Sequence, residues 1–237
     1  MKSRIKAVIC VLSMFLILVV SAYINSYYKA LEPALEALES VEYIEDDNLV
    51  FIPEFGMEEA KTGIIFYPGG KVEYTAYAPL MEACAREGIV CVLIKMPGNL
   101  AVFDINAAEG IQEQYQTVDK WYMAGHSLGG SMAASYISRH SDEFKGIILL
   151  ASYSTEALSN KELEVLSIYG TEDQILNKDD YMKYKTNLQS NYVEEVIDGG
   201  CHAYFGNYGE QKSDGEAKIT AEQQQRLTVQ AIKKFVN

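Results

Sequence analysis

The residues best suited to carry chemistry lie at positions 125–130, which read Gly-His-Ser-Leu-Gly-Gly. This segment contains the pattern Gly-x-Ser-x-Gly, in which Gly125 and Gly129 stand two residues before and after Ser127. The apolar run before it predicts a strand, and the small residues after it predict a helix. A serine nucleophile needs this setting, because a sharp strand-to-helix turn exposes the hydroxyl and only glycine fits beside it. We therefore expect Ser127 to attack an acyl carbon.

A serine nucleophile needs a histidine base, which comes last in the chain order Ser, acid, His. Two histidines follow Ser127 in the sequence. His140 ends the helix that Ser127 begins, and helix geometry carries it about 20 Å away. His202 lies in a Gly-Gly-Cys-His turn just past the last predicted strand, where glycines can aim the imidazole back at the serine. His202 is therefore the candidate base.

The acid should follow a strand that lies between the serine and the histidine. Asp173 does so, because the predicted strand that ends at Tyr169 is followed at once by Gly-Thr-Glu-Asp. Glu172 follows the same strand and is an alternative. Asp198 is closer in sequence to the candidate base but lies in its own turn, so it ranks third. We predict Asp173 as the acid of the triad.

The oxyanion of a tetrahedral intermediate needs backbone N–H donors. One donor is the residue after the nucleophile, Leu128, and the other comes from the loop after an earlier strand. That loop reads Tyr-Pro-Gly-Gly-Lys at residues 67–71, and its glycines let the backbone approach a substrate closely. Gly70 is the predicted donor and Lys71 the second choice, while a plain Pro-Gly turn is the alternative without a catalytic role.

Short apolar runs alternate with helical patterns from residue 48 onward, and this alternation predicts the elements that must position these residues. Strands that are apolar throughout are buried on both faces, which indicates a parallel sheet covered by helices on both sides. The predicted fold class is α/β, a mostly parallel, doubly wound sheet flanked by helices. The predicted strands are 49–52, 63–67, 89–96, 120–124, 145–153, 165–169 and 193–197. The predicted helices are 76–87, 105–115, the one from the serine turn to 139, one within 178–188, and 221–236 with a capping box of Thr220 and Gln223.

The first 28 residues have the pattern of a membrane-targeting segment. Lys2, Arg4 and Lys6 precede an uncharged apolar run over residues 7–24, which as a helix would reach roughly 27 Å, nearly the hydrocarbon thickness of a bilayer. Its length favours a retained transmembrane signal anchor over a signal peptide cleaved after residues 20–22. Either way the positive flank stays inside. We expect a single-pass protein of the cell membrane with an extracytoplasmic domain, or a secreted domain after cleavage.

The charge of the chain changes sign after residue 28, where the predicted membrane segment ends. The net charge is −13, and residues 1–28 hold three basic side chains and no acid, so the other 209 residues carry 17 basic against 33 acidic side chains. So acidic a domain repels phosphate backbones, and we expect no nucleic-acid partner. We predict a membrane segment over 1–28, a stem over 29–47 and one domain over 48–237.

The stem, the cysteines and the spacing of the histidines predict no further reactive or metal-binding site. Leu31, Leu35 and Leu38 have helical spacing, and we expect them to form one apolar face that is interrupted at Pro33. Cysteines at 10, 84, 91 and 201 show no Cys-x-x-Cys pattern, and we expect those of the domain to be small buried side chains. His126, His140 and His202 have no ligand spacing, so no metal site is predicted.

The Gly-x-Ser-x-Gly turn, Asp173, His202 and the loop Pro68-Gly69-Gly70 together resemble the alpha/beta-hydrolase superfamily from about residue 48 to the C-terminus. Within it, the chain is similar to the small bacterial alpha/beta hydrolase fold-5 family, which is often preceded by a membrane segment. The segments that carry this closer likeness are 67–72, 95–97, 99–102 and 205–209. The likeness implies the same triad. Cys201 departs from the pattern, which has Asn there; we expect altered loop packing but no loss of activity.

The expected activity is that of a serine hydrolase that cleaves a carboxylic ester through an acyl-enzyme, with no cofactor. Only residues 154–164 separate two predicted strands where a cap domain would insert, so we expect an open site on a minimal domain. The substrate would be a small molecule or an acyl group of the cell envelope. An acyltransferase, a thioesterase or a peptidase uses the same triad. A membrane-tethered binding protein on an inactive hydrolase fold is the alternative from another class.

Overall fold

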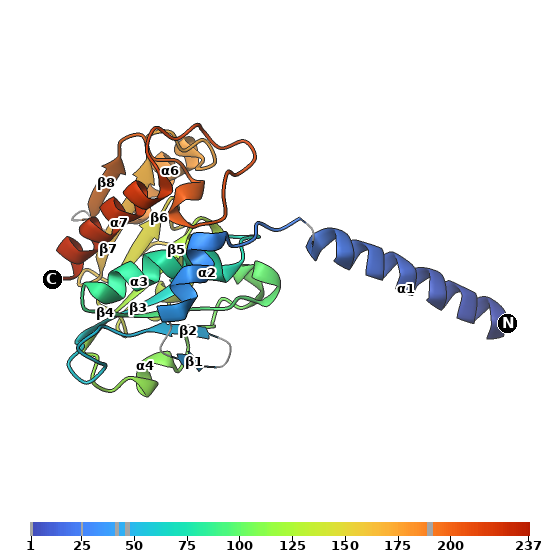
Figure 1. The fold of residues 1–237 in the computed structure, drawn as a ribbon, viewed down its shortest axis with the longest axis horizontal. Helices are drawn as coiled ribbons and strands as arrows, with labels where there is room; N and C mark the ends of the chain where they lie inside the picture. The colour runs from blue at the N-terminus through green and yellow to red at the C-terminus, as the bar shows by residue number, and fades with distance from the viewer. Residues whose placement is uncertain (1, 25, 41–42, 46–47, 189–191) are drawn as a thin grey trace.

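The computed structural model describes residues 2–24, 26–40, 43–45, 48–188 and 192–237 (Figure 1). In these residues one sheet of eight strands has the order β1-β2-β4-β3-β5-β6-β7-β8. Its pairs are parallel from β4 to β8, while β1 and β2 join antiparallel at one edge. The strands are β1 Tyr43–Glu45, β2 Asn48–Phe51, β3 Thr62–Tyr67, β4 Ile89–Leu93, β5 Lys120–His126, β6 Gly146–Leu150, β7 Glu164–Gly170 and β8 Val193–Ile197.

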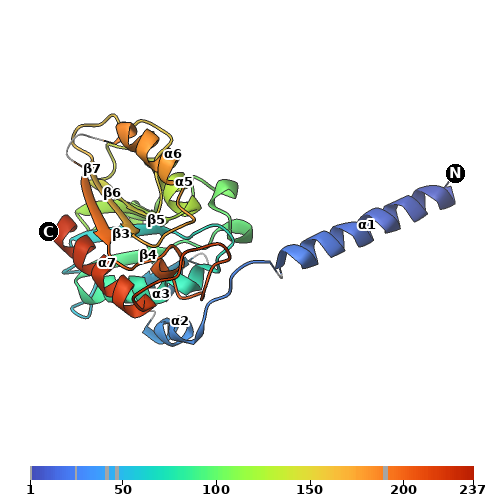
Figure 2. The same ribbon diagram turned by 90° about the horizontal axis from the view of Figure 1, so that it is seen from above.

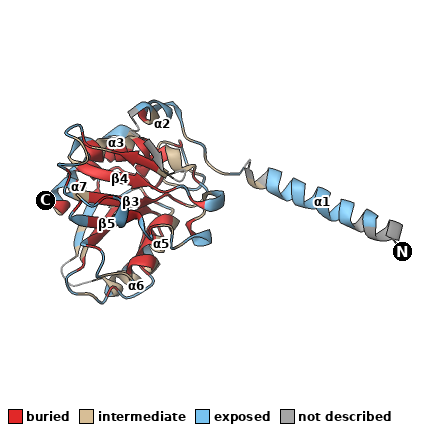
Figure 3. Cartoon of the chain, turned by 90° about the horizontal axis from the view of Figure 1, so that it is seen from below, coloured by how far each residue is buried: buried red, intermediate tan, exposed pale blue. Residues whose placement is uncertain are grey.

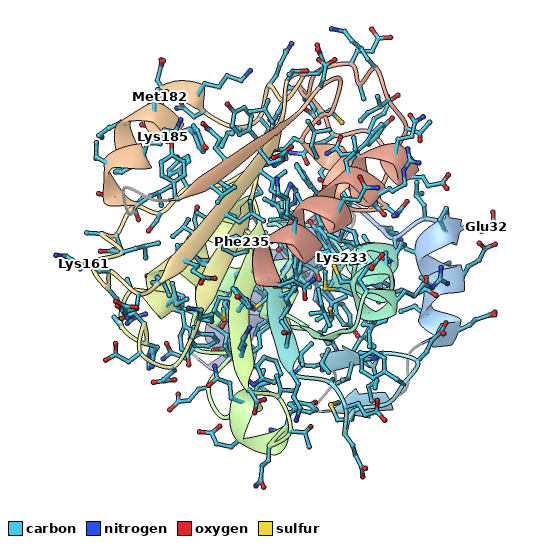
Figure 4. All side chains as sticks on the ribbon, turned by 90° about the vertical axis from the view of Figure 1, so that its left-hand side faces the viewer. Glu32, Lys161, Met182, Lys185, Lys233 and Phe235 are labelled. Carbon is cyan, nitrogen blue, oxygen red and sulfur yellow. The ribbon has the colours of Figure 1, made fainter. Side chains whose placement is uncertain are left out.

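Helices cover both faces of this sheet, whereas α1 Lys2–Ile24 extends away from it. The other helices of the described residues are α2 Glu32–Ala37, α3 Ala78–Arg86, α4 Ile111–Gln114, α5 Leu128–Ile137, α6 Lys178–Tyr184 and α7 Ala221–Val236, with 3₁₀ turns η1 Leu38–Ser40, η2 Tyr74–Tyr77, η3 Pro97–Asn99, η4 Ala101–Phe103, η5 Lys185–Asn187 and η6 Ala203–Phe205. α3 packs against both α2 and α7 on one face. α5 packs on the other face. Figure 4 shows α6, with Met182, and Lys185 of the adjoining turn η5 opposite α7, with Lys233 and Phe235.

The predicted α/β class is confirmed, because the central strands are apolar throughout and bury both faces (Figure 3). Alternate side chains of β3 show this: Ile64 and Phe66 join the core under α3 and α7, whereas Ile65 joins the core under α5. The predicted helix over 221–236 forms as α7, and its capping box is present, with Thr220 and Gln223 bonding each other's backbone N–H.

The helix predicted over residues 105–115 is wrong for most of its length. Only α4 forms there, and Gly110 before it has a left-handed backbone with φ +78°. The preceding residues form turns that the buried Tyr67 holds, since its hydroxyl donates to the Ile105 carbonyl at 2.9 Å and accepts the Ala108 N–H at 2.9 Å. A tertiary contact therefore overrides the local helical pattern.

The predicted apolar face of the stem is also wrong. Pro33 lies in the first turn of α2 and does not interrupt it, as expected for a residue with no N–H to donate. Leu31 and Leu35 are 47% and 54% exposed, whereas Ala34 is fully buried. α2 packs against α3, and small side chains fill that contact. The division into segment, stem and domain stays a prediction.

α1 extends away from the sheet, and its large apolar side chains over residues 9–20 are exposed (Figures 1 and 2). In the described part of the chain, no helix has both the length and the apolar character that crossing a bilayer requires. The transmembrane segment predicted over residues 1–28 is therefore not confirmed.

Candidate active site

Ser127 stands on a sharp turn between β5 and α5. Its backbone has φ +52° and ψ −123°, a conformation that costs about 1–3 kcal/mol for a residue other than glycine. Its N–H donates to the Leu150 carbonyl at 2.9 Å, which ties the turn to the end of the neighbouring strand β6. The turn leaves the residue partly exposed while His126 before it is buried. This is the geometry that the Gly-x-Ser-x-Gly pattern predicts.

Close backbone contacts explain the glycines around this turn. A Cβ atom at Gly125 would lie 2.6 Å from the Gly130 nitrogen, and one at Gly129 would lie 2.3 Å from the carbonyl oxygens of both Tyr67 and Pro68. Because these neighbours are backbone atoms, no side-chain rotation relieves the contact. The turn therefore packs directly against the loop that follows β3.

Asp173 and His202 form a buried pair beyond the ends of β7 and β8. The Nδ1 of His202 lies 2.9 Å from Oδ2 of Asp173, and both side chains are almost wholly buried. The other carboxylate oxygen, Oδ1, accepts the N–H groups of Ile175 and Leu176 at 2.9 and 2.8 Å. These two amides hold the carboxylate so that Oδ2 faces the imidazole.

The alternative residues point elsewhere. Glu172 is only partly exposed, and its carboxylate accepts a hydrogen bond from Lys218 at 2.6 Å. This hydrogen bond is the largest of the causes that lower the pKa of Glu172. Asp198 is exposed in the turn after β8. His140 lies at the far end of α5, where it bonds Glu143 at 2.9 Å and stacks on Tyr136.

The three predicted triad residues lie at the carboxyl ends of parallel strands, and these ends share one edge of the sheet. His202 also lies beside the nucleophile turn, since its ring centroid is 4.5 Å from that of His126, the residue directly before Ser127. The triad itself stays a prediction. Its geometric support is the Asp173–His202 pair and its contact with this turn.

The two predicted oxyanion donors are neighbours. A Cβ atom at Gly70 would lie 3.2 Å from the Cβ of Leu128. Leu128 opens α5, where a helix leaves its first amides unpaired. The N–H of Lys71, the second choice, donates to the Asn99 carbonyl at 2.8 Å, while the Gly70 N–H has no hydrogen-bond partner in the described residues. This geometry favours Gly70 over Lys71, and the oxyanion hole stays a prediction.

Two polar side chains that sequence reasoning did not single out support the histidine loop. Gln224 of α7 is buried, and its amide accepts the Cys201 N–H at 2.9 Å and donates to the Cys201 carbonyl at 2.8 Å. Asp214 accepts the Ala203 N–H at 2.9 Å and the Gln174 N–H at 3.3 Å, which joins the histidine loop to the acid loop. Neither contact has a signal in the sequence, because each joins residues far apart in the chain.

Tyr77 and His126 were also missed, although His126 lies within the nucleophile motif. Both are buried, and the Tyr77 hydroxyl lies 2.7 Å from Nδ1 of His126. Burial, and then the neighbouring His202, hold the pKa of His126 well below its ordinary value, while a backbone contact with His202 only partly offsets them. His126 is therefore neutral in the folded protein.

This neutral histidine predicts a loss of stability in acid. Below pH about 6.5 the unfolded chain takes up a proton at His126 and the folded chain does not, so the free energy of unfolding falls as the pH is lowered. His126 alone contributes up to about 1.4 kcal/mol per pH unit to this fall. Urea unfolding of the wild type and of His126→Asn at a series of pH values measures the contribution. If the free energy of unfolding changes equally with pH in both proteins, His126 is not the neutral buried group that we infer.

Comparison with known proteins agrees with this geometry. Residues 63–226, more than half of the chain, match the model of the alpha/beta hydrolase family. A search of curated proteins finds no match. Among solved structures, Est1E from Butyrivibrio proteoclasticus is similar, with 17% identity and a TM-score of 0.59 over 83% of this chain and 97% of that chain.

Two further structures are similar at the level of the fold. An esterase from Pyrobaculum calidifontis has 16% identity and a TM-score of 0.58 over 86% of this chain and 89% of that chain. A monoacylglycerol lipase from Paleococcus ferrophilus has 14% identity and a TM-score of 0.58 over 79% of this chain and 98% of that chain. The residues that match the family model include the serine turn, Asp173 and His202, and the chain belongs to the alpha/beta hydrolase family.

Proposed function

We propose that this protein is a serine hydrolase that cleaves a carboxylic ester or a related acyl bond through an acyl-enzyme. The observation that carries the proposal is the buried Asp173–His202 hydrogen bond beside a strained turn that presents Ser127. A buried carboxylate that holds an imidazole next to such a serine is the arrangement of a nucleophile, a base and an orienting acid.

Each residue has one task in the proposed reaction. Ser127 Oγ attacks the acyl carbon while His202 Nε2 takes its proton and then returns it to the leaving group. Asp173 keeps the Nδ1 proton of His202 in place and stabilises the imidazolium that forms. The N–H groups of Leu128 and Gly70 bind the oxyanion, and water then attacks the acyl-enzyme by the same route.

Esters are the proposed substrate class. Structures of similar fold carry the names esterase and monoacylglycerol lipase, and Ser127 is partly exposed. The connection between β6 and β7 is short, which leaves no room for a cap domain there. A panel of aryl esters of increasing acyl length measures the preference for acyl-chain length. Negligible turnover across the whole panel would contradict an ester substrate and favour a peptidase or an acyltransferase.

A fluorophosphonate probe tests the nucleophile directly. We expect the wild type to label at Ser127, as identified by mass spectrometry of the labelled peptide, and Ser127→Ala not to label. Ser131→Ala is the matched control, because Ser131 is one turn further along α5 and its hydroxyl donates to the Tyr153 carbonyl at 2.9 Å. If Ser127→Ala retains the label, or if the wild type does not label, the proposal is contradicted and a non-catalytic binding protein is favoured.

The location of the domain is part of the proposal. The basic residues Lys2, Arg4 and Lys6 before an apolar run and an acidic domain support export of the domain from the cytoplasm. We expect the protein outside the cytoplasm, either at full length and retained at the membrane or without residues 1–22. Cell fractionation combined with the intact mass decides this, and a full-length chain in the cytoplasmic fraction contradicts export.

A further inference from the structure

A buried chain of hydrogen bonds connects the loop after β3 to the nucleophile turn. The Gly69 N–H donates to the Tyr77 hydroxyl at 3.0 Å, and that hydroxyl lies 2.7 Å from Nδ1 of His126. The three groups come from the loop after β3, from η2 and from the end of β5. Tyr77 and His126 are buried, so both depend on these partners. The interaction therefore joins two segments that the proposed reaction uses.

The direction of the second hydrogen bond follows from counting partners. If the Tyr77 hydroxyl donates to His126 Nδ1, only the Nε2–H of His126 is left without a hydrogen-bond partner among the described residues. If His126 donates instead, both the hydroxyl proton and Nε2 are unsatisfied. The first arrangement leaves fewer buried polar groups unpaired and is favoured. It also suits a neutral ring, in agreement with the lowered pKa of His126.

This contact helps to aim the Gly70 amide. The amide before Gly70 is held by Tyr77, and the amide after it, that of Lys71, is held by the Asn99 carbonyl at 2.8 Å. Gly70 itself has no partner for its N–H among the described residues. A Cβ at Gly69 would lie 2.6 Å from the Tyr77 oxygen and 2.8 Å from His126 Nδ1, so this close approach requires glycine.

His126 also packs against the candidate base and its loop. Its ring centroid lies 4.5 Å from that of His202 and 5.5 Å from that of Phe205. A charged ring there would oppose the imidazolium that forms on His202 during proton transfer. A neutral ring packs against it without this penalty.

We propose that Tyr77 and His126 are positioning residues for acyl transfer, because their hydrogen bond holds the Gly69–Gly70 backbone against the Ser127 turn. The pair acts through Gly70 and does not touch the reacting atoms. This inference rests on the proposed serine hydrolase function and adds two residues to its machinery. It predicts a loss in transition-state stabilisation, and not in substrate binding, when the hydrogen bond is removed.

The variant Tyr77→Phe removes the hydroxyl and keeps the ring. We expect kcat for an aryl ester to fall about 10- to 100-fold, since a displaced donor costs less than the 10²–10³ of a deleted one, while KM stays within about threefold. Tyr181→Phe is the matched control. Tyr181 is a buried tyrosine of α6, and its hydroxyl also has two hydrogen-bond partners, Ser167 at 2.9 Å and Glu194 at 2.8 Å. We expect Tyr181→Phe to lose about as much thermal stability as Tyr77→Phe but to keep the kcat of the wild type.

Substitutions at His126 test the same bond from its other end. His126→Asn keeps an acceptor near the position of Nδ1 and should retain most of kcat, whereas His126→Leu should lose as much as Tyr77→Phe. The double variant Tyr77→Phe/His126→Leu should lose no more than about either single variant, because each breaks the same hydrogen bond. This series decides the question even where Tyr77→Phe does not fold.

Four results would overturn the positioning role: kcat of Tyr77→Phe within about twofold of the wild type, a loss confined to KM, an equal loss of kcat in Tyr181→Phe, or equal activities of His126→Asn and His126→Leu. Each of these leaves an active wild type and therefore leaves the proposed function standing. A wild type that neither labels with the probe nor turns over esters would overturn the proposed function and the role together.

Discussion

Asp173→Asn should lower kcat by about 10⁴-fold with little change in fold. The amides of Ile175 and Leu176 hold one carboxylate oxygen at 2.9 and 2.8 Å, so the asparagine oxygen stays there and its NH₂ faces His202 Nδ1. A donor against Nδ1 forces the imidazole proton onto Nε2. Nε2 is then unable to accept the serine proton, and the base is lost.

Glu172→Gln is the matched control for this change. It makes the same chemical replacement one residue earlier, where the carboxylate is partly exposed and bonds the exposed Lys218. We expect kcat within about twofold of the wild type, since exposed ion pairs of this kind contribute little to stability. Steady-state hydrolysis of one aryl ester by the three proteins measures the difference. A kcat of Asp173→Asn within about tenfold of the wild type, or a larger loss in Glu172→Gln, would reject Asp173 as the acid.

Gly129→Ala should reduce both stability and rate. The added Cβ would lie 2.3 Å from the carbonyl oxygens of Tyr67 and Pro68, and either α5 or the loop after β3 must move to relieve this contact. Overpacking of this kind costs about 1–3 kcal/mol in the free energy of unfolding. The movement also separates Leu128 from Gly70, and a misplacement of about 1 Å lowers kcat by about 10².

Gly56→Ala separates the two effects. Gly56 has φ +90° and nothing within 4 Å of its added Cβ, so alanine there costs about 1–2 kcal/mol through backbone strain alone. We expect a comparable loss of stability with an unchanged kcat. Urea unfolding gives the stability of each variant, and ester hydrolysis is compared at equal folded fractions. A Gly129→Ala variant with the kcat of Gly56→Ala would show that the turn tolerates the displacement.

Most of the sheet was predictable because local composition specifies it. Residues 63–67 of β3 and 121–125 of β5 have no polar interruption, and burial on both faces demands this pattern. β8 was predicted with its observed bounds, and the helix at α7 has a capping box at its start. By contrast β1 is a three-residue edge strand, too short to produce a periodic signal.

The parts that could not be predicted depend on contacts between distant residues. The region before α4 forms turns because Tyr67, about forty positions earlier, bonds its backbone. α2 buries Ala34 and exposes Leu35 because α3 lies close against it. Gln224 and Asp214 hold the histidine loop from α7 and from a surface loop. Hydropathy and spacing describe neighbours along the chain and do not record which residue meets which across the fold.

The sequence by itself determined the family likeness and the serine turn, and it predicted the order of serine, acid and histidine, because these signals lie within short segments whose residue types have a local physical cause. Only the tertiary structure decided that Asp173 faces His202 while Glu172 faces Lys218. It alone also decided that the Lys71 amide is occupied while that of Gly70 is not. Successive side chains and amides of a turn point in different directions, and their partners come from distant segments, so composition and spacing were unable to separate them.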